Sequence, residues 1–283
     1  QLVELLEEFR SLRVFPEDPK RVPPCSRGVL HIPLLDEDCT PYAAKQRRFF
    51  PEETQMIQAE VKQLQECGII RPSTSAWAAA VVAVRKKYGT LRLCTDFMML
   101  NDRSRSDSGG LGNITSIFDT LKGSSYFTAM DLALGFFQLE IAELDKHKTA
   151  FRDAHGQIWE YNRYGFGLKI LLAVFSSYMR EALGDLKGEG VENWPDDLFC
   201  YSSSFDEHMN NLRRLLTRLK QYGLSVNFPK SSWCMPLQEF LGNKVDRDGL
   251  SPAPSIMIAV AKLDPPSTVE QLRSFLGMTG YMR

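Results

Sequence analysis

Long apolar runs are missing from this sequence. No stretch of about 18 apolar residues is present, which is the length that a helix needs to span a bilayer. The N-terminal residues Gln1 to Arg10 are rich in Glu and Leu, and they lack the basic stretch followed by an apolar stretch that marks a signal peptide. We therefore predict no membrane span, no signal peptide and an intracellular location.

The motifs of a zinc site are also missing. The six cysteines contain no C-x-x-C pair, and the four histidines show no H-x-x-x-H spacing. The scattered cysteines are typical of reduced thiols in an intracellular protein. An excess of positive charge is absent too, because the formal net charge is −1. This argues against a protein that binds nucleic acid through bulk charge. Local basic clusters such as Lys45 to Arg48 are typical of a solvated face, and only their position relative to a site would make them phosphate contacts.

What is present is the composition of a globular protein. The 283 residues are 43% hydrophobic and 24% charged, enough to form two or more subdomains around apolar cores. Helical and strand patterns are mixed without regular alternation, which predicts an α+β fold with a largely antiparallel sheet. Helices are expected near the N-terminus, over 51–67, 167–186 and 204–222, and from 267 onward; strands are expected over 78–87, 90–97, 125–131 and 137–141.

Three aspartates are the candidates for chemistry. Asp131 ends an apolar strand pattern, and Asp196 and Asp197 follow 65 residues later, just before another apolar pattern. Carboxylates near strand ends can converge, and Mg²⁺ is usually held by one or two carboxylates together with substrate phosphates. Two such ions can activate a hydroxyl nucleophile and stabilise the leaving oxygen in phosphoryl transfer. The alternative is that Pro195-Asp196-Asp197 is only a turn, since proline favours the first central position of one.

Ordered blocks of sequence surround these aspartates. The blocks that carry the likeness are Gly68-Ile69-Ile70-Arg71-Pro72-Ser73, Leu91-Arg92-Leu93-Cys94-Thr95-Asp96-Phe97 with Leu100-Asn101, Tyr126-Phe127-Thr128-Ala129-Met130-Asp131, Lys148-Thr149-Ala150-Phe151, Phe166-Gly167-Leu168, Trp194-Pro195-Asp196-Asp197, Phe240-Leu241-Gly242 and Leu272-Arg273-Ser274-Phe275-Leu276-Gly277. In this order they resemble the reverse transcriptase of gypsy-type long-terminal-repeat retrotransposons and, more distantly, that of retroviruses. The likeness runs from about Val14 to the C-terminus.

The resemblance implies a right-hand polymerase fold. The expected segments are a lead-in over 1–40, fingers over 41–105 and 139–169, a palm over 106–138 and 170–248, and the start of a thumb over 249–283. The implied activity is that of an RNA-directed DNA polymerase, a nucleotidyltransferase that adds deoxynucleotides to a primer 3′-hydroxyl. Its expected partners are an RNA or DNA template with its primer, deoxynucleotide triphosphates and, in a longer parent chain, protease, ribonuclease H and integrase domains.

Individual roles follow from the resemblance by position. The metal-binding and catalytic carboxylates would be Asp131, Asp196 and Asp197, which would hold two Mg²⁺ or Mn²⁺ ions, and Lys230 would donate a proton to the departing pyrophosphate. The residues implied for the incoming nucleotide are Lys86, Arg92, Phe136, Phe166 and Gly167, with Phe136 as the gate beneath the sugar. The residues implied for the primer terminus are Phe240, Leu241 and Gly242. Without the resemblance, the aromatic residues among them would be ordinary core residues and Arg92 an ordinary surface residue.

The sequence also departs from the family pattern close to the predicted site. Trp194 and Pro195 replace the tyrosine and the variable residue before the paired aspartates, and residues 165–172 lack the two prolines and the asparagine expected there. Glu192 interrupts a strand that should be apolar, so this strand is expected to be exposed, repaired by a partner or poorly formed. The alternatives are therefore a catalytically inactive remnant that binds nucleic acid, and a protein-interaction scaffold.

Overall fold

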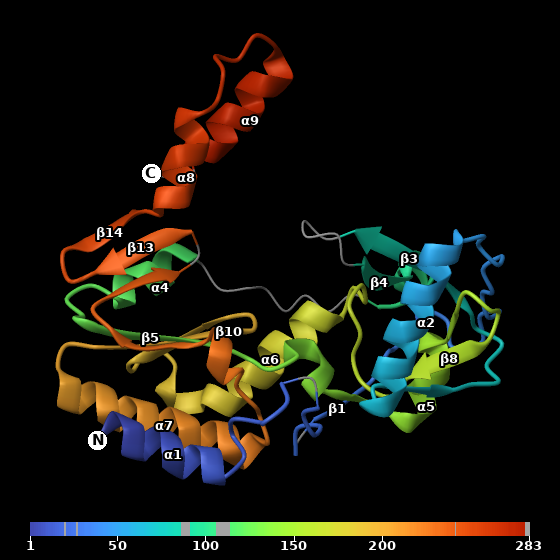
Figure 1. Ribbon diagram of the computed structural model, residues 1–283, viewed down its shortest axis with the longest axis horizontal. Coiled ribbons are helices and arrows are strands. Elements are labelled where there is room, and N and C mark those ends of the chain that lie inside the picture. The colour runs from blue at the N-terminus through green and yellow to red at the C-terminus, as the bar shows by residue number, and fades with distance from the viewer. Residues whose placement is uncertain (20, 27, 86–90, 106–113, 241, 281–283) are drawn as a thin grey trace.

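Two lobes make up the body of the molecule. In the computed structural model, residues 1–19, 21–26, 28–85, 91–105, 114–240 and 242–280 are described. One lobe contains a four-stranded sheet and the other a five-stranded sheet, and helix α6 (Leu171–Leu183) lies between them (Figure 1). A pair of helices near the C-terminus projects away from both lobes.

The four-stranded lobe is built on an antiparallel sheet. Its strands are β5 (Tyr126–Asp131), β9 (Val191–Trp194), β10 (Asp197–Ser202) and β11 (Ser232–Met235), in the order β11-β5-β10-β9. Strand β10 pairs along its whole length with β5, from Asp197 opposite Asp131 to Ser202 opposite Tyr126. Because side chains alternate between faces, each strand presents one set of residues to the helices and the other set to the opposite side.

Helices cover one face of this sheet. The covering helices are α1 (Leu2–Ser11), α6 and α7 (Phe205–Tyr222), with α1 lying along α7 (Figure 1). Helix α7 begins where the Ser204 hydroxyl accepts a hydrogen bond from the Glu207 N–H, and it ends at Gly223, whose φ is 69°. Its leucines at 212, 215, 216 and 219 are fully buried against the sheet, as their helical spacing predicts.

A smaller apolar cluster lies on the other face of the sheet. Here a three-stranded antiparallel sheet, β12 (Leu237–Phe240), β13 (Asn243–Asp246) and β14 (Gly249–Pro252), lies with helix α4 (Ile114–Thr120) over β5 and β10 (Figure 1). The ring of Phe240 stacks on that of Phe199, with 4.4 Å between the centroids. These contacts cover only part of the face, so the ends of β5 and β10 that carry Asp131 and Asp197 extend beyond them.

The five-stranded lobe has the strand order β2-β8-β7-β3-β4. Its strands are β2 (Ile70–Pro72), β3 (Ala79–Arg85), β4 (Leu91–Asp96), β7 (Phe151–Arg152) and β8 (Ile158–Tyr161). The pairing is antiparallel except between β3 and β7. Its helices are α2 (Pro51–Glu66), α3 (Met98–Arg103) and α5 (Glu143–Lys146), followed by the short 3-10 helix η2 (His147–Thr149). Helix α2 starts at Pro51 and ends at Glu66, and its C-cap residue Cys67 is followed by Gly68 with a φ of 67°, as the sequence predicts.

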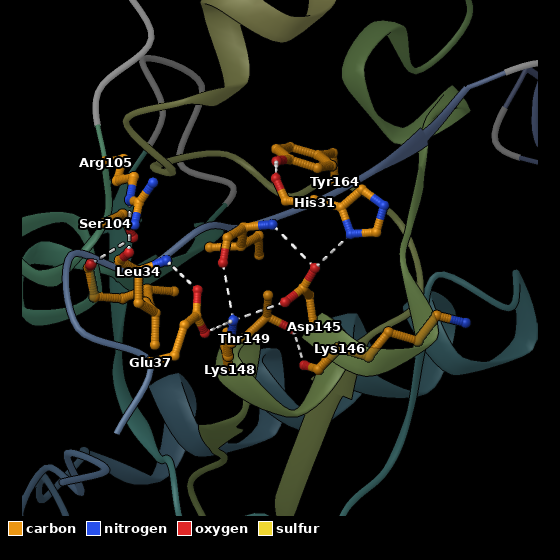
Figure 2. A network of polar contacts seen from close by, with 12 residues as sticks. His31, Leu34, Glu37, Ser104, Arg105, Asp145, Lys146, Lys148, Thr149 and Tyr164 are labelled. Atoms are coloured by element: carbon orange, nitrogen blue, oxygen red, sulfur yellow. Dashed lines mark hydrogen bonds and ion pairs between the residues drawn. The ribbon is translucent and has the colours of Figure 1, made fainter. Parts of the chain in front are cut away.

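A buried ion pair attaches the N-terminal segment to this lobe. Figure 2 shows Lys148 pointing between Asp145 and Glu37, with its Nζ 2.7 Å from Asp145 Oδ1 and 3.0 Å from Glu37 Oε2. The same ammonium donates to the Ile32 carbonyl, and Asp145 Oδ2 accepts from the Ile32 N–H and contacts His31 Nδ1 at 3.1 Å. We call this set of contacts the strap, because it fixes the extended segment 31–37 to α5 and η2. Strand β1 (Val29–Leu30) continues the attachment through β6 (Glu140–Ile141).

The C-terminal helices form an arm that stands apart from the lobes. Helix α8 (Pro254–Ala261) and helix α9 (Val269–Gly280) lie beside each other and extend from β14 (Figure 1). Several large apolar side chains of the arm are exposed: Met257, Ile258, Leu263, Val269, Leu272 and Leu276. Across the described part of the chain, no helix combines the length and apolar character that crossing a bilayer requires.

Two predicted elements are wrong in detail. Residues 137–141 are not one strand: η1 (Gly135–Gln138) precedes the two-residue strand β6. The reason is local, because Leu134 and Gly135 have φ values of 57° and 31°, and left-handed residues turn the chain out of a strand. The helix predicted from 167 begins only at Leu171, since Gly167 has a φ of 96° and residues 165–170 form a turn instead.

The strand around Glu192 does form. Strand β9 pairs with β10 over its whole length, from Trp194 opposite Asp197 to Val191 opposite Cys200. Glu192 is only 4% exposed, so the expectation of an exposed or poorly formed strand is wrong. One of its oxygens, Oε2, is buried without a hydrogen-bond partner, and burial raises the pKa of this carboxyl.

Candidate active site

Asp131 and Asp197 are directly opposite each other in the antiparallel pair β5–β10. Residues that face each other in such a pair point to the same side of the sheet, so both carboxylates lie on the face opposite to α1, α6 and α7. Asp131 is also held from below by the segment that carries η4 (Phe228–Lys230). Its N–H donates to Ser231 Oγ at 3.3 Å, and its carbonyl accepts from the Asn227 N–H at 2.8 Å. Both the N–H and the carbonyl of Asp131, at this end of β5, are therefore hydrogen-bonded to the same segment.

Asp196 belongs to the tight turn between β9 and β10. Strand pairing closes at Trp194 and Asp197, so Pro195 and Asp196 are the two central residues of the turn. The Asp196 carboxylate lies against η1, because a Cβ added to Gly135 would come within 3.3 Å of Asp196 Oδ2. Glycine at 135 thus lets the turn approach η1, which carries Phe136. The turn that carries Asp196 and the helix η1 that carries Phe136 are therefore in contact.

The pKa values of Asp196 and Asp197 are both raised. Partial burial raises the pKa of Asp197 to about 6, with further contributions from the charges of Asp196 and Asp131. The pKa of Asp196 is raised as well, mainly by burial and then by Asp131. Lys230 opposes both shifts and lies with its Nζ 3.3 Å from Asp131 Oδ2. The site therefore concentrates negative charge that a single exposed lysine offsets only in part.

This charge distribution fits a cation bound together with a substrate. Within the described residues, no group of three or more His, Cys, Asp and Glu side chains is arranged to hold a metal ion unaided. Mg²⁺, however, is commonly bound by one or two carboxylates together with waters and substrate phosphates. Asp131 and Asp197 offer two hard oxygen ligands on one face, and a divalent cation bound there would favour the charged form of Asp197, whose pKa is otherwise raised. The residues present thus fit such an ion.

The rings of Phe136, Phe137 and Phe166 form an aromatic wall, and Phe136 follows Gly135, which lies beside Asp196. The ring of Phe136 packs edge-on against Phe175 with a centroid separation of 4.9 Å, and against Phe166 at 5.8 Å. Phe166 also contacts Phe137 edge-on at 5.4 Å, yet it remains 46% exposed. One side of this wall is therefore anchored in the core and the other faces solvent. The structure brings Phe136, Phe166 and the turn of Gly167 together, as their predicted common role requires.

The remaining predicted contacts are Lys86, Arg92, Phe240, Leu241 and Gly242. Lys86 and Leu241 are not among the described residues, and Arg92 is described only by its backbone, which pairs with Val84 in the β3–β4 hairpin. Phe240 is 5% exposed, so its ring belongs to the apolar cluster and is not free to contact a primer. Gly242 has a φ of 71°, and its carbonyl accepts from the Ala253 N–H.

Sequence reasoning missed residues that support the site. Ser231 and Asn227 hold Asp131, and Gly135 makes room for Asp196. Asn101 bonds to the Gly167 turn through its side chain. Asn101 lies in one of the ordered blocks, so the sequence did mark it as a candidate residue. Ser231 lies in none of them, and its contact with Asp131 forms only because β5 and the segment after η4 are adjacent in the fold.

The sequence matches a known protein family over most of its length. The family described as reverse transcriptase (RNA-dependent DNA polymerase) matches residues 57–279. The retrovirus-related Pol polyprotein from transposon opus of Drosophila melanogaster is 34% identical over 232 residues, which is 80% of this chain and 23% of that protein. This chain thus spans about a quarter of the length of that relative.

Solved structures show the same fold. The foamy viral protease-reverse transcriptase in complex with double-stranded DNA superposes with a TM-score of 0.88 at 21% identity, over 99% of this chain and 48% of that one. The same viral protein in complex with an RNA/DNA hybrid gives a TM-score of 0.85 at 20% identity, over 99% and 37%. The right-hand polymerase fold predicted from the sequence is confirmed.

Proposed function

Because this chain belongs to the reverse transcriptase family, we propose that it is the polymerase portion of a retrotransposon Pol polyprotein and that it adds deoxynucleotides to a primer 3′-hydroxyl on an RNA or DNA template. One observation carries the proposal. Asp131 and Asp197 face each other at the open end of the β5–β10 pair, with Asp196 and Lys230 beside them. The foamy viral relative of the same fold binds double-stranded DNA and an RNA/DNA hybrid, which supports a primer–template as the partner here.

Members of this family generally use divalent metal ions. Asp131, Asp196 and Asp197 would hold two Mg²⁺ or Mn²⁺ ions together with the nucleotide phosphates, and these ions would activate the 3′-hydroxyl and stabilise the leaving oxygen. The chain's own residues orient the reactants. Lys230 is the proposed proton donor to the departing pyrophosphate, and Lys86 and Arg92 are the proposed triphosphate contacts.

The aromatic wall supports a role in nucleotide binding. Phe136 is anchored on the buried ring of Phe175, so its edge is a fixed barrier beside the carboxylates. We propose that this barrier excludes a 2′-hydroxyl by bulk, and that Phe166 and Gly167 line the same pocket. We propose that the β12–β13 turn, with Phe240, Leu241 and Gly242, lies near the primer terminus and contacts it through its backbone.

The test is primer extension on poly(rA)–oligo(dT) with Mg²⁺. Asp131→Asn and Asp197→Asn keep the size of the side chain and remove its charge, so each variant should lose about 10³-fold or more in rate, equivalent to several kcal/mol of transition-state stabilisation. Asp119→Asn is the matched control, because Asp119 lies in α4 and pairs with exposed Lys122. Circular dichroism and thermal melting establish that each protein is folded.

The outcome also separates the alternatives. Extension by the wild-type protein that the two site variants lack supports a working polymerase despite Trp194 and Pro195. If the folded wild-type protein extends no primer but binds the hybrid in a salt-sensitive manner, the chain is an inactive nucleic-acid-binding remnant. If the folded wild-type protein neither extends a primer nor binds the hybrid, the remaining alternative is a protein-interaction scaffold.

A further inference from the structure

The turn that carries Phe166 and Gly167 belongs to no helix or strand. Residues 165–170 run from the end of the five-stranded lobe to the start of α6. Gly167 has a φ of 96°, and a Cβ at this position would come within 3.3 Å of the Thr95 carbonyl. The turn therefore packs closely on the end of β4, and something other than backbone ladder bonds must hold it there.

Asn101, in helix α3, supplies that attachment. Its Nδ2 donates to the Gly167 carbonyl at 2.7 Å, and its Oδ1 accepts from the Lys169 N–H at 2.7 Å. One amide thus satisfies both a carbonyl and an N–H of the same turn, two residues apart. A side chain with only a donor or only an acceptor cannot make both bonds.

Lys169 completes the attachment from the other direction. Its Nζ donates to the backbone carbonyls of Asn101 at 3.4 Å and Ser104 at 3.2 Å, at the C-terminal end of α3. A cation is favourable at this end of a helix, where carbonyls lack helical partners. Asn101 and Lys169 therefore bind each other's backbones, and we call these four hydrogen bonds the clasp.

The clasp determines where Phe166 lies. Phe166 immediately precedes Gly167, and its half-exposed ring packs edge-on against Phe136 and Phe137. Fixing the Gly167 carbonyl and the Lys169 N–H leaves Phe166 little freedom to swing away from Phe136. We propose that Asn101 is a positioning residue that fixes the aromatic wall and so sets the affinity for the incoming deoxynucleotide. This inference rests on the proposed function for its nucleotide part, whereas the clasp itself does not depend on activity.

The first experiment measures hydrogen exchange at the Lys169 amide in the full chain without nucleotide. Asn101→Ala removes both side-chain bonds, so exchange at Lys169 should accelerate by about 5- to 30-fold. Asn101→Asp keeps an acceptor for the Lys169 N–H but loses the donor to Gly167, so Lys169 should stay protected. Asn162→Ala is the matched control, because the Asn162 amide makes a comparable bond to the Gly68 carbonyl away from the turn.

The second experiment measures single-nucleotide incorporation of dTTP on poly(rA)–oligo(dT). Asn101→Ala should raise KM for dTTP by about 5- to 30-fold with little change in kcat, as expected when binding of the nucleotide is weakened uniformly. Asn101→Asp should also raise KM, because its carboxylate repels the Gly167 carbonyl. Asn162→Ala should leave both constants unchanged, and equal melting temperatures exclude a general loss of structure.

The results distinguish this inference from the proposed function. Unchanged Lys169 exchange in Asn101→Ala overturns the clasp whether or not the protein is active. Faster exchange with an unchanged KM overturns the positioning role. A wild-type protein that extends no primer overturns the proposed function, and with it the nucleotide part of the inference, while the exchange result still decides the clasp.

Discussion

Glu192 is a buried acidic residue in the strand β9. It lies in β9 opposite Phe199, on the face that carries the small apolar cluster, and its Oε2 has no hydrogen-bond partner. Burial raises the pKa of its carboxyl, and the charge of Lys187 opposes this only in part. The folded protein therefore favours the protonated form more strongly than the unfolded chain does.

This imbalance predicts the effect of Glu192→Gln on stability. Folding raises the pKa of Glu192, so its protonated form contributes to the free energy of unfolding. This contribution is fully present below the pKa of the unfolded chain and is lost as pH rises through the pKa of the folded protein. Glutamine resembles the protonated form, so at pH 7 the variant should gain about 1–2 kcal/mol, or roughly 2–6 °C in Tm. Thermal melting at pH 7 and near pH 4.5 measures this, and the gain should shrink at the lower pH.

Glu189→Gln serves as the control for this prediction. Glu189 is exposed and lies three residues earlier, so the same change there should leave Tm within about 1 °C, as for most surface substitutions. An equal gain for Glu192→Gln at both pH values would contradict a charge effect and indicate a packing effect.

The residues of the site were predictable to different degrees. Asp131 ends an apolar strand pattern in the sequence and Asp196 and Asp197 precede another, and the structure does bring Asp131 opposite Asp197. The supporting contacts of Asn101 and Ser231 were not predictable, because they join residues 66 and 100 positions apart in the chain. No local pattern records such a pair.

At the scale of elements, the edge strand β9 depends on the glycine before it. Gly190 has a φ of 88°, and a Cβ there would lie 2.2 Å from Asn211 Nδ2, a side chain buried on α7. Gly188 has a similar φ of 84° but open space around its Cβ position. The two glycines therefore share the backbone strain of a substitution and differ only in the clash.

We predict that Gly190→Ala is clearly more destabilising than Gly188→Ala. The left-handed backbone should cost both variants about 1–2 kcal/mol, and the displacement of Asn211 should add about 1–3 kcal/mol to Gly190→Ala alone. Urea unfolding followed by tryptophan fluorescence gives both values. Equal losses would mean that Asn211 moves aside without cost.

The strap is the second element-scale feature with a measurable consequence. The side chains of Lys148 and Asp145 are 8% and 9% exposed, so Lys148→Met leaves a buried carboxylate without its main partner. We expect a loss of about 3–5 kcal/mol in the free energy of unfolding. The control is Lys122→Met, which breaks an exposed pair with Asp119 of the same 2.7 Å length and should cost less than about 1 kcal/mol.

Chemical unfolding of the two lysine variants decides between these values. Similar losses would show that burial does not strengthen the Lys148 pair. Faster proteolysis within segment 31–37 of Lys148→Met would further locate the loss at the strap (Figure 2).

Elements with strong end signals were predicted well from the sequence. Helices α2 and α7 have a proline or a capping serine at the start and a glycine just after the end, and both were found within a few residues of their predicted limits. The prediction failed at 137–141 and at 167–170, where Leu134, Gly135 and Gly167 take left-handed conformations. An apolar run gives the same pattern whether it continues straight or turns, so backbone conformation decides there.

At the scale of the whole molecule, the fold supports a nucleic-acid partner, whereas the net charge does not favour one. A net charge of −1 gives no general attraction for nucleic acid, so the proposed binding would depend on local clusters such as Lys45, Arg47 and Arg48. We predict that affinity for an RNA–DNA hybrid falls steeply between 50 and 200 mM salt, because counterions are released from each neutralised phosphate. Fluorescence anisotropy of a labelled hybrid measures the slope.

A variant at one of the basic residues gives this prediction a sharper form. Arg48→Ala should weaken hybrid binding and reduce the salt slope by about 1 if Arg48 contacts a phosphate. An unchanged slope would show that the 45–48 cluster lies outside the bound strand. Lys62→Ala is a control on the same lobe, since Lys62 is exposed on α2 and lies near Glu66.

The overall fold was predictable only because many blocks occur in one order. Composition and periodicity alone gave an α+β chain, and the right-hand polymerase fold came from the ordered blocks between residues 68 and 277. The chain folds as two lobes, each built on one large sheet, with α6 between them, and this arrangement depends on contacts between segments far apart in sequence (Figure 1). Each block predicts only the local structure around its own residues, and the order of the blocks predicts the overall fold.

The arm of α8 and α9 bears on how the molecule behaves in concentrated solution. Its apolar side chains, from Met257 to Leu276, are presented to water rather than to either lobe. Water disfavours such surface, and two arms that meet can cover each other. The solubility of this chain should therefore be governed by a small part of its mass, and a few polar substitutions on the arm should raise the concentration at which it precipitates while leaving both lobes unchanged.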